Sequence, residues 1–294
     1  MTPKTLLRIV PLLCVSLVAL GCANGMFYQP SRAILETPMQ QNLQYERVFF
    51  PSLDGTRLSG WFLPAAGKPV GTVVHFHGNA QNMSAHYAYV RWMVRENFNV
   101  FVFDYRGYGE SEGKPGRRGI YKDCLAAIRY VQSRKDVDPD RIVLFGQSLG
   151  GALALAVMGE EKPAGVRAVA SDSAFYSYRT LARDRMSRVF LLSLVRWPLS
   201  FLVVTNGHSP GPVMDKIAPV PVLILHGTED TVVPYSHGKM LFEAAREPKT
   251  FLRVLAGHHT DALTRFGDLY RKDLVSFFTQ ALTGPASGQA PTGP

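Results

Sequence analysis

The residues most able to do chemistry surround a serine in the middle of the chain. Ser148 lies in the motif Gly-Gln-Ser-Leu-Gly at 146–150, between an apolar stretch at 141–145 and a run of small apolar residues at 152–158. A strand, a tight turn and a helix in this order form a nucleophile elbow, which exposes a serine hydroxyl at the carboxyl end of the strand. The hydroxyl becomes a nucleophile only when a base removes its proton and a third group orients that base. The chain must therefore also supply a histidine and an acid.

The acid of such a triad follows the serine in the chain, and the histidine follows the acid. Asp230 comes soon after a predicted strand at 220–226, at the sheet edge where the elbow also lies. We choose it over Asp172, which follows another predicted strand, and over its neighbour Glu229, which points away when Asp230 points inward. The predicted acid is therefore Asp230.

The base is expected in the loop after the last predicted strand, where two histidines are adjacent. We choose His258 over His259 because His258 directly follows Gly257, and His259 is expected to form local hydrogen bonds. His226, at the end of a core strand, is interpreted as structural, and His237, at the start of a helix, as a surface residue. His258 therefore completes the predicted triad.

A tetrahedral intermediate at the serine would carry an oxyanion, which backbone N–H donors stabilise by about 2.7–4 kcal/mol each. One donor is expected from Leu149, which follows the nucleophile. The other is expected from Asn79, because Gly78 allows the backbone to turn after the predicted strand at 70–76. His77 precedes the serine in the chain and is interpreted as a residue that braces this loop.

These side chains require a sheet that brings several strand ends together. The hydrophobic periodicity predicts strands at 45–50, 57–63, 70–76, 99–103, 141–145, 166–170, 220–226 and 250–255, and helices at 84–97, 121–134, 152–158, 236–246 and 261–282. Strands that alternate with helices indicate an α/β fold with a mostly parallel central sheet and helices on both faces. The candidate residues then lie at the carboxyl ends of the strands, where such sheets bind ligands.

One interval, between the predicted strands that end at 170 and start at 220, is far longer than the usual connection. Residues 189–204 within it carry a single charge, Arg196, and both this charge and Pro198 oppose a membrane-spanning helix. We interpret residues 175–215 as a small helical cap over the site. The alternatives are ordinary packing against the sheet and an apolar face that dips into a membrane to collect lipid-like substrate.

The first residues are predicted to be a targeting segment rather than part of the fold. Lys4 and Arg8 precede an apolar stretch at 9–20 that contains a proline. This stretch is shorter than the ~20 residues that a membrane-spanning helix needs. The pattern therefore predicts a signal peptide at 1–21.

The signal peptide would end before a cysteine. The sequence Ala-Leu-Gly-Cys at 19–22 resembles the lipobox of bacterial lipoproteins, although alanine replaces the usual leucine at its first position. We expect a lipidated Cys22 and a tether at 22–44; the alternative is an ordinary signal peptide with a chance cysteine. Cys14 would leave with the signal peptide, so Cys124 is expected to remain as a small buried residue. The protein is then expected in the bacterial cell envelope, with its domain in the periplasm and the outer membrane slightly favoured over the inner.

Composition and charge narrow the remaining possibilities. The chain has 294 residues, of which 46% are hydrophobic and 19% charged, which suits one large domain, here residues 45–283, followed by a disordered tail at 284–294. The formal net charge is +9, but no dense Lys/Arg run or nucleic-acid-binding motif accompanies it, so a nucleic-acid partner is not expected. A generic basic surface is the preferred interpretation of the charge, and attraction to an anionic surface is the alternative.

Five motifs in the right order resemble the α/β-hydrolase superfamily. They are Phe-His-Gly-Asn-Ala at 76–80, Asp-Tyr-Arg-Gly-Tyr-Gly at 104–109, Gly-Gln-Ser-Leu-Gly-Gly at 146–151, His-Gly-Thr-Glu-Asp at 226–230 and Gly-His at 257–258. Over residues 45–282 the pattern is similar to the Bem46-like serine hydrolases and their ABHD13/ABHD17-type relatives. The resemblance implies the α/β-hydrolase fold, the triad Ser148, Asp230 and His258, and a structural loop at 104–109. Such relatives often have His-Asn-Asp at the last motif, whereas this chain has His-His-Thr-Asp, so only the histidine is carried over.

The motifs and the resemblance together predict a membrane-tethered serine hydrolase that cleaves a carboxylic ester or thioester through an acyl-enzyme. Relatives include esterases, thioesterases that remove fatty acyl groups from protein cysteines, and peptidases. The expected substrate is a small-molecule or lipid-like acyl compound, and the mechanism requires no metal and no organic cofactor. The alternatives are a peptidase or amidase that uses the same triad and a non-catalytic surface lipoprotein. The acyl chain, the leaving group and the oligomeric state do not follow from the sequence.

Overall fold

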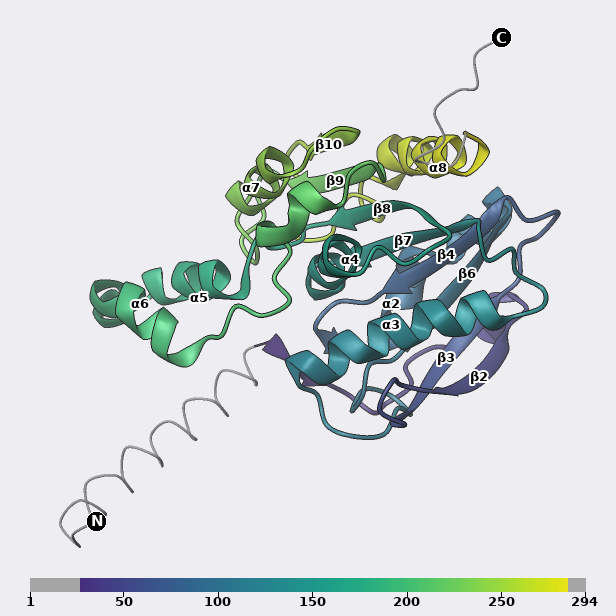
Figure 1. The fold of residues 1–294 in the computed structure, drawn as a ribbon, viewed down its shortest axis with the longest axis horizontal. Coiled ribbons are helices and arrows are strands. Elements are labelled where there is room, and N and C mark those ends of the chain that lie inside the picture. The colour runs from purple at the N-terminus through teal and green to yellow at the C-terminus, as the bar shows by residue number, and fades with distance from the viewer. Residues whose placement is uncertain (1–26, 285–294) are drawn as a thin grey trace, which may run out of the picture.

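The structure is a computed structural model that describes residues 27–284. Its centre is a sheet of eight strands in the order β10-β9-β8-β7-β4-β6-β3-β2 (Figure 1). The strands from β10 to β6 are parallel to one another, whereas β3 pairs antiparallel with both β6 and β2. The strand bounds are β2 Glu46–Pro51, β3 Arg57–Leu63, β4 Gly71–Phe76, β6 Phe98–Phe103, β7 Ile142–Gln147, β8 Val166–Asp172, β9 Val222–Gly227 and β10 Lys249–Val254.

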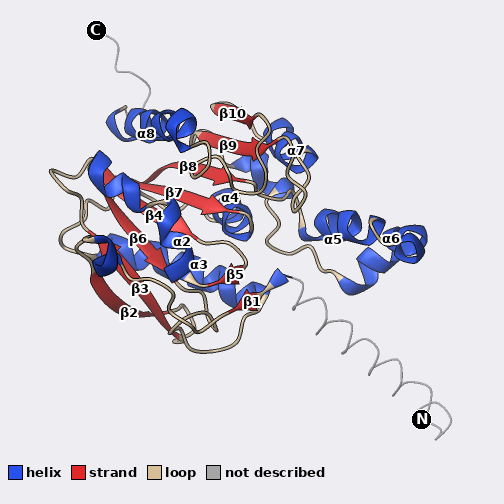
Figure 2. Ribbon diagram, turned by 180° about the vertical axis from the view of Figure 1, so that it is seen from behind, coloured by secondary structure: helices blue, strands red, loops and turns tan. Residues whose placement is uncertain are grey.

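Helices cover both faces of this sheet (Figure 2). Helices α3, α4 and α7 and the 3-10 helix η4 pack on one face, and η2, η3 and α8 pack on the other. The α-helix bounds are α2 Met83–His86, α3 Arg117–Ser133, α4 Leu149–Glu160, α5 Tyr178–Ser187, α6 Phe190–Val203, α7 Ser236–Ala244 and α8 Gly267–Thr283. The 3-10 helices are η1 Pro38–Gln41, η2 Tyr87–Tyr89, η3 Arg91–Glu96 and η4 Gly211–Lys216.

The central strands are buried along their whole length, as parallel strands between two helical layers must be. Because successive side chains point to opposite faces, each strand contributes to two cores. Val74, Phe101 and Leu144 belong to the core under α3 and α4, whereas their neighbours Val73, Val100 and Phe145 belong to the core under α8. The predicted mostly parallel sheet with helices on both faces is confirmed.

Two helix predictions differ from the structure. The predicted helix at 84–97 is divided into α2, η2 and η3, because Val90 leaves helical geometry, with φ −126° and ψ −15°, and the Trp92 indole donates to the Tyr89 carbonyl at 2.8 Å. The predicted helix at 261–282 begins only at Gly267. Asp261 is used instead in a turn, where its Oδ2 accepts the His258 N–H at 2.9 Å.

The long interval between β8 and β9 contains the helices α5 and α6, which form a hairpin that stands out from the sheet on the side away from α8 (Figure 1). Pro198 lies inside α6. Arg183 on α5 ties the two helices together, because its Nε donates to the Ser200 hydroxyl at 2.9 Å. No helix within residues 27–284 is long and apolar enough to cross a membrane.

The segment before β2 packs against the domain, which differs from the tether predicted at 22–44. Phe27 and Tyr28 are buried, and the short strand β1 Gln29–Pro30 pairs in parallel with β5 Ala80–Gln81. The Asn82 side chain then donates to the Ser31 carbonyl at 3.0 Å. The predicted signal peptide at 1–21, Cys22, and residues 285–294 of the predicted tail lie outside the described residues.

Candidate active site

Ser148 occupies a strained turn between β7 and α4. Its φ of 51° and ψ of −114° are unusual for a residue with a side chain, and its N–H donates to the Asp172 carbonyl at 2.9 Å. A Cβ on Gly146 would lie 2.3 Å from the Gly150 oxygen, and a Cβ on Gly150 would lie 1.9 Å from the Phe76 oxygen. The two glycines are therefore required by backbone contact, and the predicted elbow has its expected geometry.

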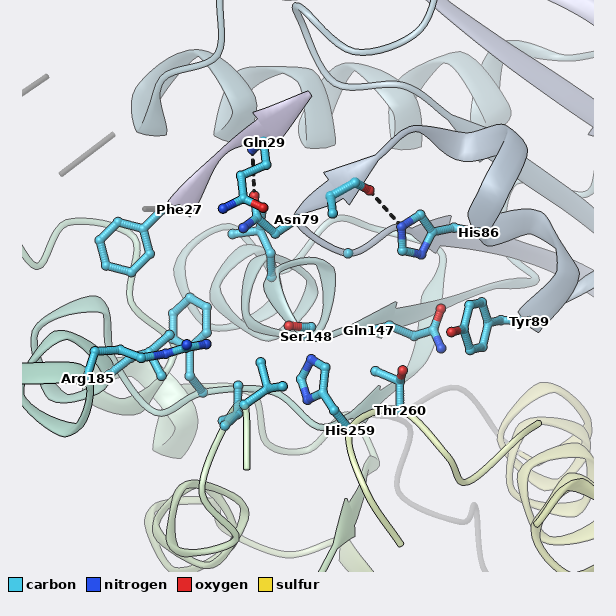
Figure 3. A pocket seen from close by; sticks show the side chains of 17 residues that line it. Phe27, Gln29, Asn79, His86, Tyr89, Gln147, Ser148, Arg185, His259 and Thr260 are labelled. Atoms are coloured by element: carbon cyan, nitrogen blue, oxygen red, sulfur yellow. Dashed lines mark hydrogen bonds between the residues drawn. The ribbon is translucent and has the colours of Figure 1, made fainter. Parts of the chain in front are cut away.

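An acid and a histidine meet beside this turn. The Nδ1 of His259 lies 2.7 Å from Asp230 Oδ2, and both His259 and Ser148 line the same pocket (Figure 3). Burial alone would raise the pKa of Asp230, but the hydrogen bond from His259 and the nearby Val233 N–H outweigh it, so the pKa is lowered below its ordinary value. A carboxylate can only accept, so His259 Nδ1 carries the proton and Nε2 has a free lone pair.

His258, the predicted base, does not reach the pocket. Its side chain is exposed, its Nδ1 lies 3.1 Å from the Glu229 carbonyl, and it is not among the residues that line the cavity. The backbone turns tightly here, because Ala256 has a φ of 52° and Glu229 N–H bonds the Gly257 carbonyl at 2.9 Å. The next residue, His259, is the one that turns inward. The prediction of His258 is therefore corrected to His259.

The other candidates have structural partners. Asp172 is buried, and burial raises its pKa to about 7; its Oδ1 accepts the Ser173 hydroxyl at 3.0 Å rather than a histidine. His226 is buried against the Val233 carbonyl at 2.9 Å, as its structural interpretation requires. His237 is also fully buried, between the Tyr176 N–H and Asp184, so its prediction as a surface residue is wrong.

The two predicted oxyanion donors face the same cavity. Leu149 begins α4 and Asn79 lies in the loop after β4, and both line the pocket that contains Ser148. The close approach of Gly150 to the Phe76 and His77 carbonyls fixes this loop against the elbow. Within residues 27–284 neither the Asn79 N–H nor the Leu149 N–H donates to a protein acceptor. Both donors are thus available to a ligand.

Asn79 is held by groups that the sequence analysis did not associate with it. Its Oδ1 accepts the Gln29 N–H at 2.9 Å (Figure 3). Its carbonyl accepts the Tyr108 hydroxyl at 2.8 Å. Tyr105 supports the preceding turn, since its hydroxyl donates to the His77 carbonyl at 3.0 Å. The loop at 104–109 therefore braces the site from one side and the N-terminal segment braces it from the other.

The cavity around Ser148 has a volume of about 520 Å³. Towards α5 its wall is apolar and contains Phe27, Phe175, Leu181, Val232 and Val233. The opposite wall carries the polar groups of Gln147, Tyr89, His86 and Thr260 (Figure 3). Arg185 of α5 is the charged residue of the lining and lies on the same side as Phe27 (Figure 3). The size and the apolar wall suit a small organic ligand or a short acyl chain.

A metal ion would need a group of side chains that could bind it. Between residues 27 and 284 no group of three or more His, Cys, Asp or Glu side chains could hold a metal ion.

Known proteins resemble this chain over most of its length. The protein YfhR of Escherichia coli (strain K12) is 40% identical over 286 residues, which cover 95% of each chain. WAV2 of Arabidopsis thaliana, an α/β hydrolase domain-containing protein, is 38% identical over 82% of this chain and 80% of its own. Bem46 of Schizosaccharomyces pombe is 29% identical over 94% and 93% of the two chains.

Two further comparisons concern the fold around the site. The family model described as serine aminopeptidase, S33, matches residues 67–212, which include the elbow. The structure of the esterase Pf2001 of Pyrococcus furiosus superimposes with a TM-score of 0.71, at 21% identity, over 86% of this chain and 98% of the esterase. At this level of identity the likeness shows a shared fold.

Proposed function

Since the chain belongs to the Bem46-like proteins of the α/β-hydrolase superfamily, and is therefore an enzyme of the hydrolase class, we propose that it cleaves carboxylic esters or thioesters with Ser148 as nucleophile. The observation that carries this proposal is the 2.7 Å contact between His259 and Asp230, in the pocket that Ser148 also lines. Esterase activity in the structural relative Pf2001 agrees with it.

The proposed reaction has two halves. In the first, Ser148 Oγ bonds to the carbonyl carbon while its proton passes to His259 Nε2. The carbonyl electron pair moves to oxygen and then returns, and the bond to the alcohol or thiol breaks as this leaving group takes the proton from His259. In the second half, water attacks the acyl-serine by the same steps and releases the carboxylic acid and the free serine.

Charge develops on the substrate oxygen and on the His259 imidazole during these steps, and neighbouring groups stabilise both. The Asn79 and Leu149 N–H groups donate to the oxyanion, and each is expected to contribute about 2.7–4 kcal/mol to transition-state stability. Asp230 keeps His259 in the tautomer that accepts at Nε2 and stabilises the imidazolium that forms.

The lining of the pocket favours an ester or thioester over a peptide with a free amino terminus. An aminopeptidase must hold the substrate's ammonium group, and a carboxylate usually does so. None of the described residues that line this pocket is acidic, and Arg185 would repel an ammonium group. The apolar wall at Phe27, Phe175 and Leu181 is well placed to take an acyl chain.

Two measurements on purified protein test this proposal. A fluorophosphonate probe is expected to label the wild type and to leave Ser148→Ala unlabelled; equal labelling of both would refute it. A series of p-nitrophenyl esters of rising chain length, compared with aminoacyl anilides, then separates the esterase from the peptidase. Higher kcat/KM on the anilides than on every ester would favour the peptidase.

We also propose that the enzyme is anchored in the bacterial cell envelope through lipid on Cys22, with its domain in the periplasm and the outer membrane favoured. The lipobox-like sequence at 19–22 supports this. Palmitate with an alkyne tag, fed to cells, should label the wild type and not Cys22→Ser. Equal labelling of both proteins would contradict the lipid anchor.

A further inference from the structure

The α5–α6 hairpin carries much of the exposed apolar surface of the described chain. Of the 17 large hydrophobic side chains that are exposed within residues 27–284, nine lie in residues 189–202. We call six of them, each at least 58% exposed, the α6 face: Phe190, Leu191, Leu194, Trp197, Phe201 and Leu202. An exposed apolar face of this kind on a globular domain marks an interaction surface.

Arginines are frequent in the segment that carries this face, and two of them contact it. Residues 177–204 contain five arginines, at 179, 183, 185, 188 and 196, and a single acid, Asp184, which is bound to His237 at 2.7 Å. The guanidinium groups of Arg183 and Arg179 lie 4.0 and 4.2 Å from the ring centres of Trp197 and Phe201. Aromatic and aliphatic side chains bordered by cations are the pattern of helices that lie in an anionic lipid interface.

The same hairpin borders the active-site pocket. Leu181 and Arg185 of α5 line the cavity that contains Ser148. Phe27 lines it too, and the Phe27 ring packs against Tyr178 at the start of α5, with ring centres 5.0 Å apart. The apolar wall of the pocket therefore leads to the base of the hairpin.

The start of the described chain lies at this place. Phe27 comes five residues after Cys22, and five extended residues reach at most about 18 Å. A lipid on Cys22, as proposed above, would therefore hold the base of the hairpin close to the bilayer. Phe27, the first described residue, thus lies at the base of the hairpin that carries the α6 face.

We propose that the α6 face inserts into the interface of a bilayer that contains anionic lipids, while the arginines contact the head groups, so that the pocket opens at the membrane surface. Amphiphilic acyl compounds are then the substrates that reach Ser148 most readily. A dimer through the same face fits less well, because a two-fold contact would bring the arginines of both copies together with few acids to offset them. Binding to the bilayer does not depend on the hydrolase reaction.

Trp197 provides the probe for a direct test. Brominated lipids quench only tryptophans that enter the bilayer. The other two tryptophans, Trp61 and Trp92, lie outside the hairpin, Trp61 buried and Trp92 partly buried. In vesicles of brominated phosphatidylcholine with phosphatidylglycerol, we expect the full-length chain to lose most of its Trp197 fluorescence, measured as the difference from Trp197→Phe. A chain with Trp197→Phe and Leu269→Trp, which moves the probe to an exposed position on α8, should not be quenched, although its lipid anchor is unchanged.

Charge and apolar contact are separated by two variants. Leu194→Glu is expected to lower the quenching at least tenfold, whereas Leu269→Glu, at a similarly exposed leucine outside the hairpin, should have no effect. Arg196→Gln should weaken partitioning into phosphatidylglycerol vesicles about fivefold and leave neutral vesicles unaffected. Circular dichroism checks that each variant is folded.

Each outcome bears on the proposal. Quenching that Leu194→Glu abolishes and Leu269→Glu does not would support it. An unquenched Trp197 would overturn it, and so would an α6 variant that changes a dimer to a monomer in light scattering without any quenching. The Trp197 fluorescence of Ser148→Ala should be quenched as much as that of the wild type, because this variant changes only the proposed nucleophile. Bilayer binding can therefore be tested even if the proposed reaction is wrong.

Discussion

Replacing Asp230 with asparagine tests how the acid controls His259. Asp230 Oδ1 accepts the N–H groups of Val232 and Val233, both at 2.8 Å, and Oδ2 accepts His259 Nδ1 at 2.7 Å. An asparagine has one acceptor oxygen, which the two backbone donors would hold. Its NH₂ group would then face the ring and donate to Nδ1, so the proton would move to Nε2 and His259 could no longer act as a base.

The expected loss follows from this change of tautomer. In a serine-protease triad the same substitution lowers kcat by about 10⁴ with little change in geometry, which corresponds to about 5.5 kcal/mol at about 1.36 kcal/mol per tenfold change. We expect a loss of this order in the hydrolysis of a p-nitrophenyl ester. Asp172→Asn is the matched control, because Asp172 is also buried but its carboxylate bonds Ser173 instead of a histidine. Its kcat should fall by less than about tenfold.

Two results would refute this reasoning. Asp230→Asn within tenfold of the wild-type kcat would show that His259 does not depend on this carboxylate. Equal losses in Asp230→Asn and Asp172→Asn would show that buried charge in general, rather than the contact with His259, supports the activity.

The remaining predictions concern the turn, the N-terminal segment and the pH dependence of folding. Gly150→Ala would place a Cβ 1.9 Å from a backbone oxygen and should lower the free energy of unfolding by about 3 kcal/mol or more, whereas Gly116→Ala, with nothing within 4 Å, should change it little; chemical denaturation measures both. Gln29→Pro removes the N–H that binds Asn79 Oδ1 and should lower kcat about fivefold with KM unchanged, while Gln29→Ala keeps that N–H and should retain the wild-type kcat. Burial raises the pKa of Asp172 from 3.8 to about 7, so the folded state holds this proton more tightly than the unfolded state, by about 4 kcal/mol. That contribution to the free energy of unfolding is complete below pH 3.8 and is lost as the pH rises through about 7. Thermal unfolding between pH 4 and 8 should therefore show a smaller decline in stability for Asp172→Asn than for the wild type. Equal declines would contradict the raised pKa of Asp172.

The central sheet could be predicted because its strands are unusually clear in the sequence. The strands β4, β6 and β7 are rich in β-branched and aromatic apolar residues, and each is followed by glycine or polar residues at the edge where ligands bind. Ser148 and Asp230 follow such strands, and backbone geometry alone fixes where their side chains emerge. The elbow is the clearest case, since Gly146 and Gly150 are there because no other residue fits.

The choice between His258 and His259 could not be made from local spacing. Adjacent residues in a loop point in different directions, and the direction depends on the turn at Ala256 and on the bond from Glu229 N–H to the Gly257 carbonyl. A signal was nevertheless present. His259-Thr260-Asp261 matches the His-Asn-Asp pattern of similar proteins better than the pair that begins at His258.

The role of the N-terminal segment was hidden by its composition. Residues 27–44 show little hydrophobic periodicity, yet Phe27 and Tyr28 are buried and Gln29 binds Asn79 through its backbone. A contact made by a main-chain N–H leaves no trace in residue type. The burial of His237 could not be predicted for a different reason. Its partner Asp184 lies in another helix, 53 positions earlier in the chain.

The most direct test of the catalytic account compares two adjacent histidines. His259→Ala removes the proposed base, which contacts Asp230, whereas His258→Ala removes an exposed side chain outside the pocket. The rate of fluorophosphonate labelling at Ser148 should fall by about 10³-fold or more in His259→Ala and remain at the wild-type rate in His258→Ala. A large loss in His258→Ala, with His259→Ala unaffected, would contradict the account.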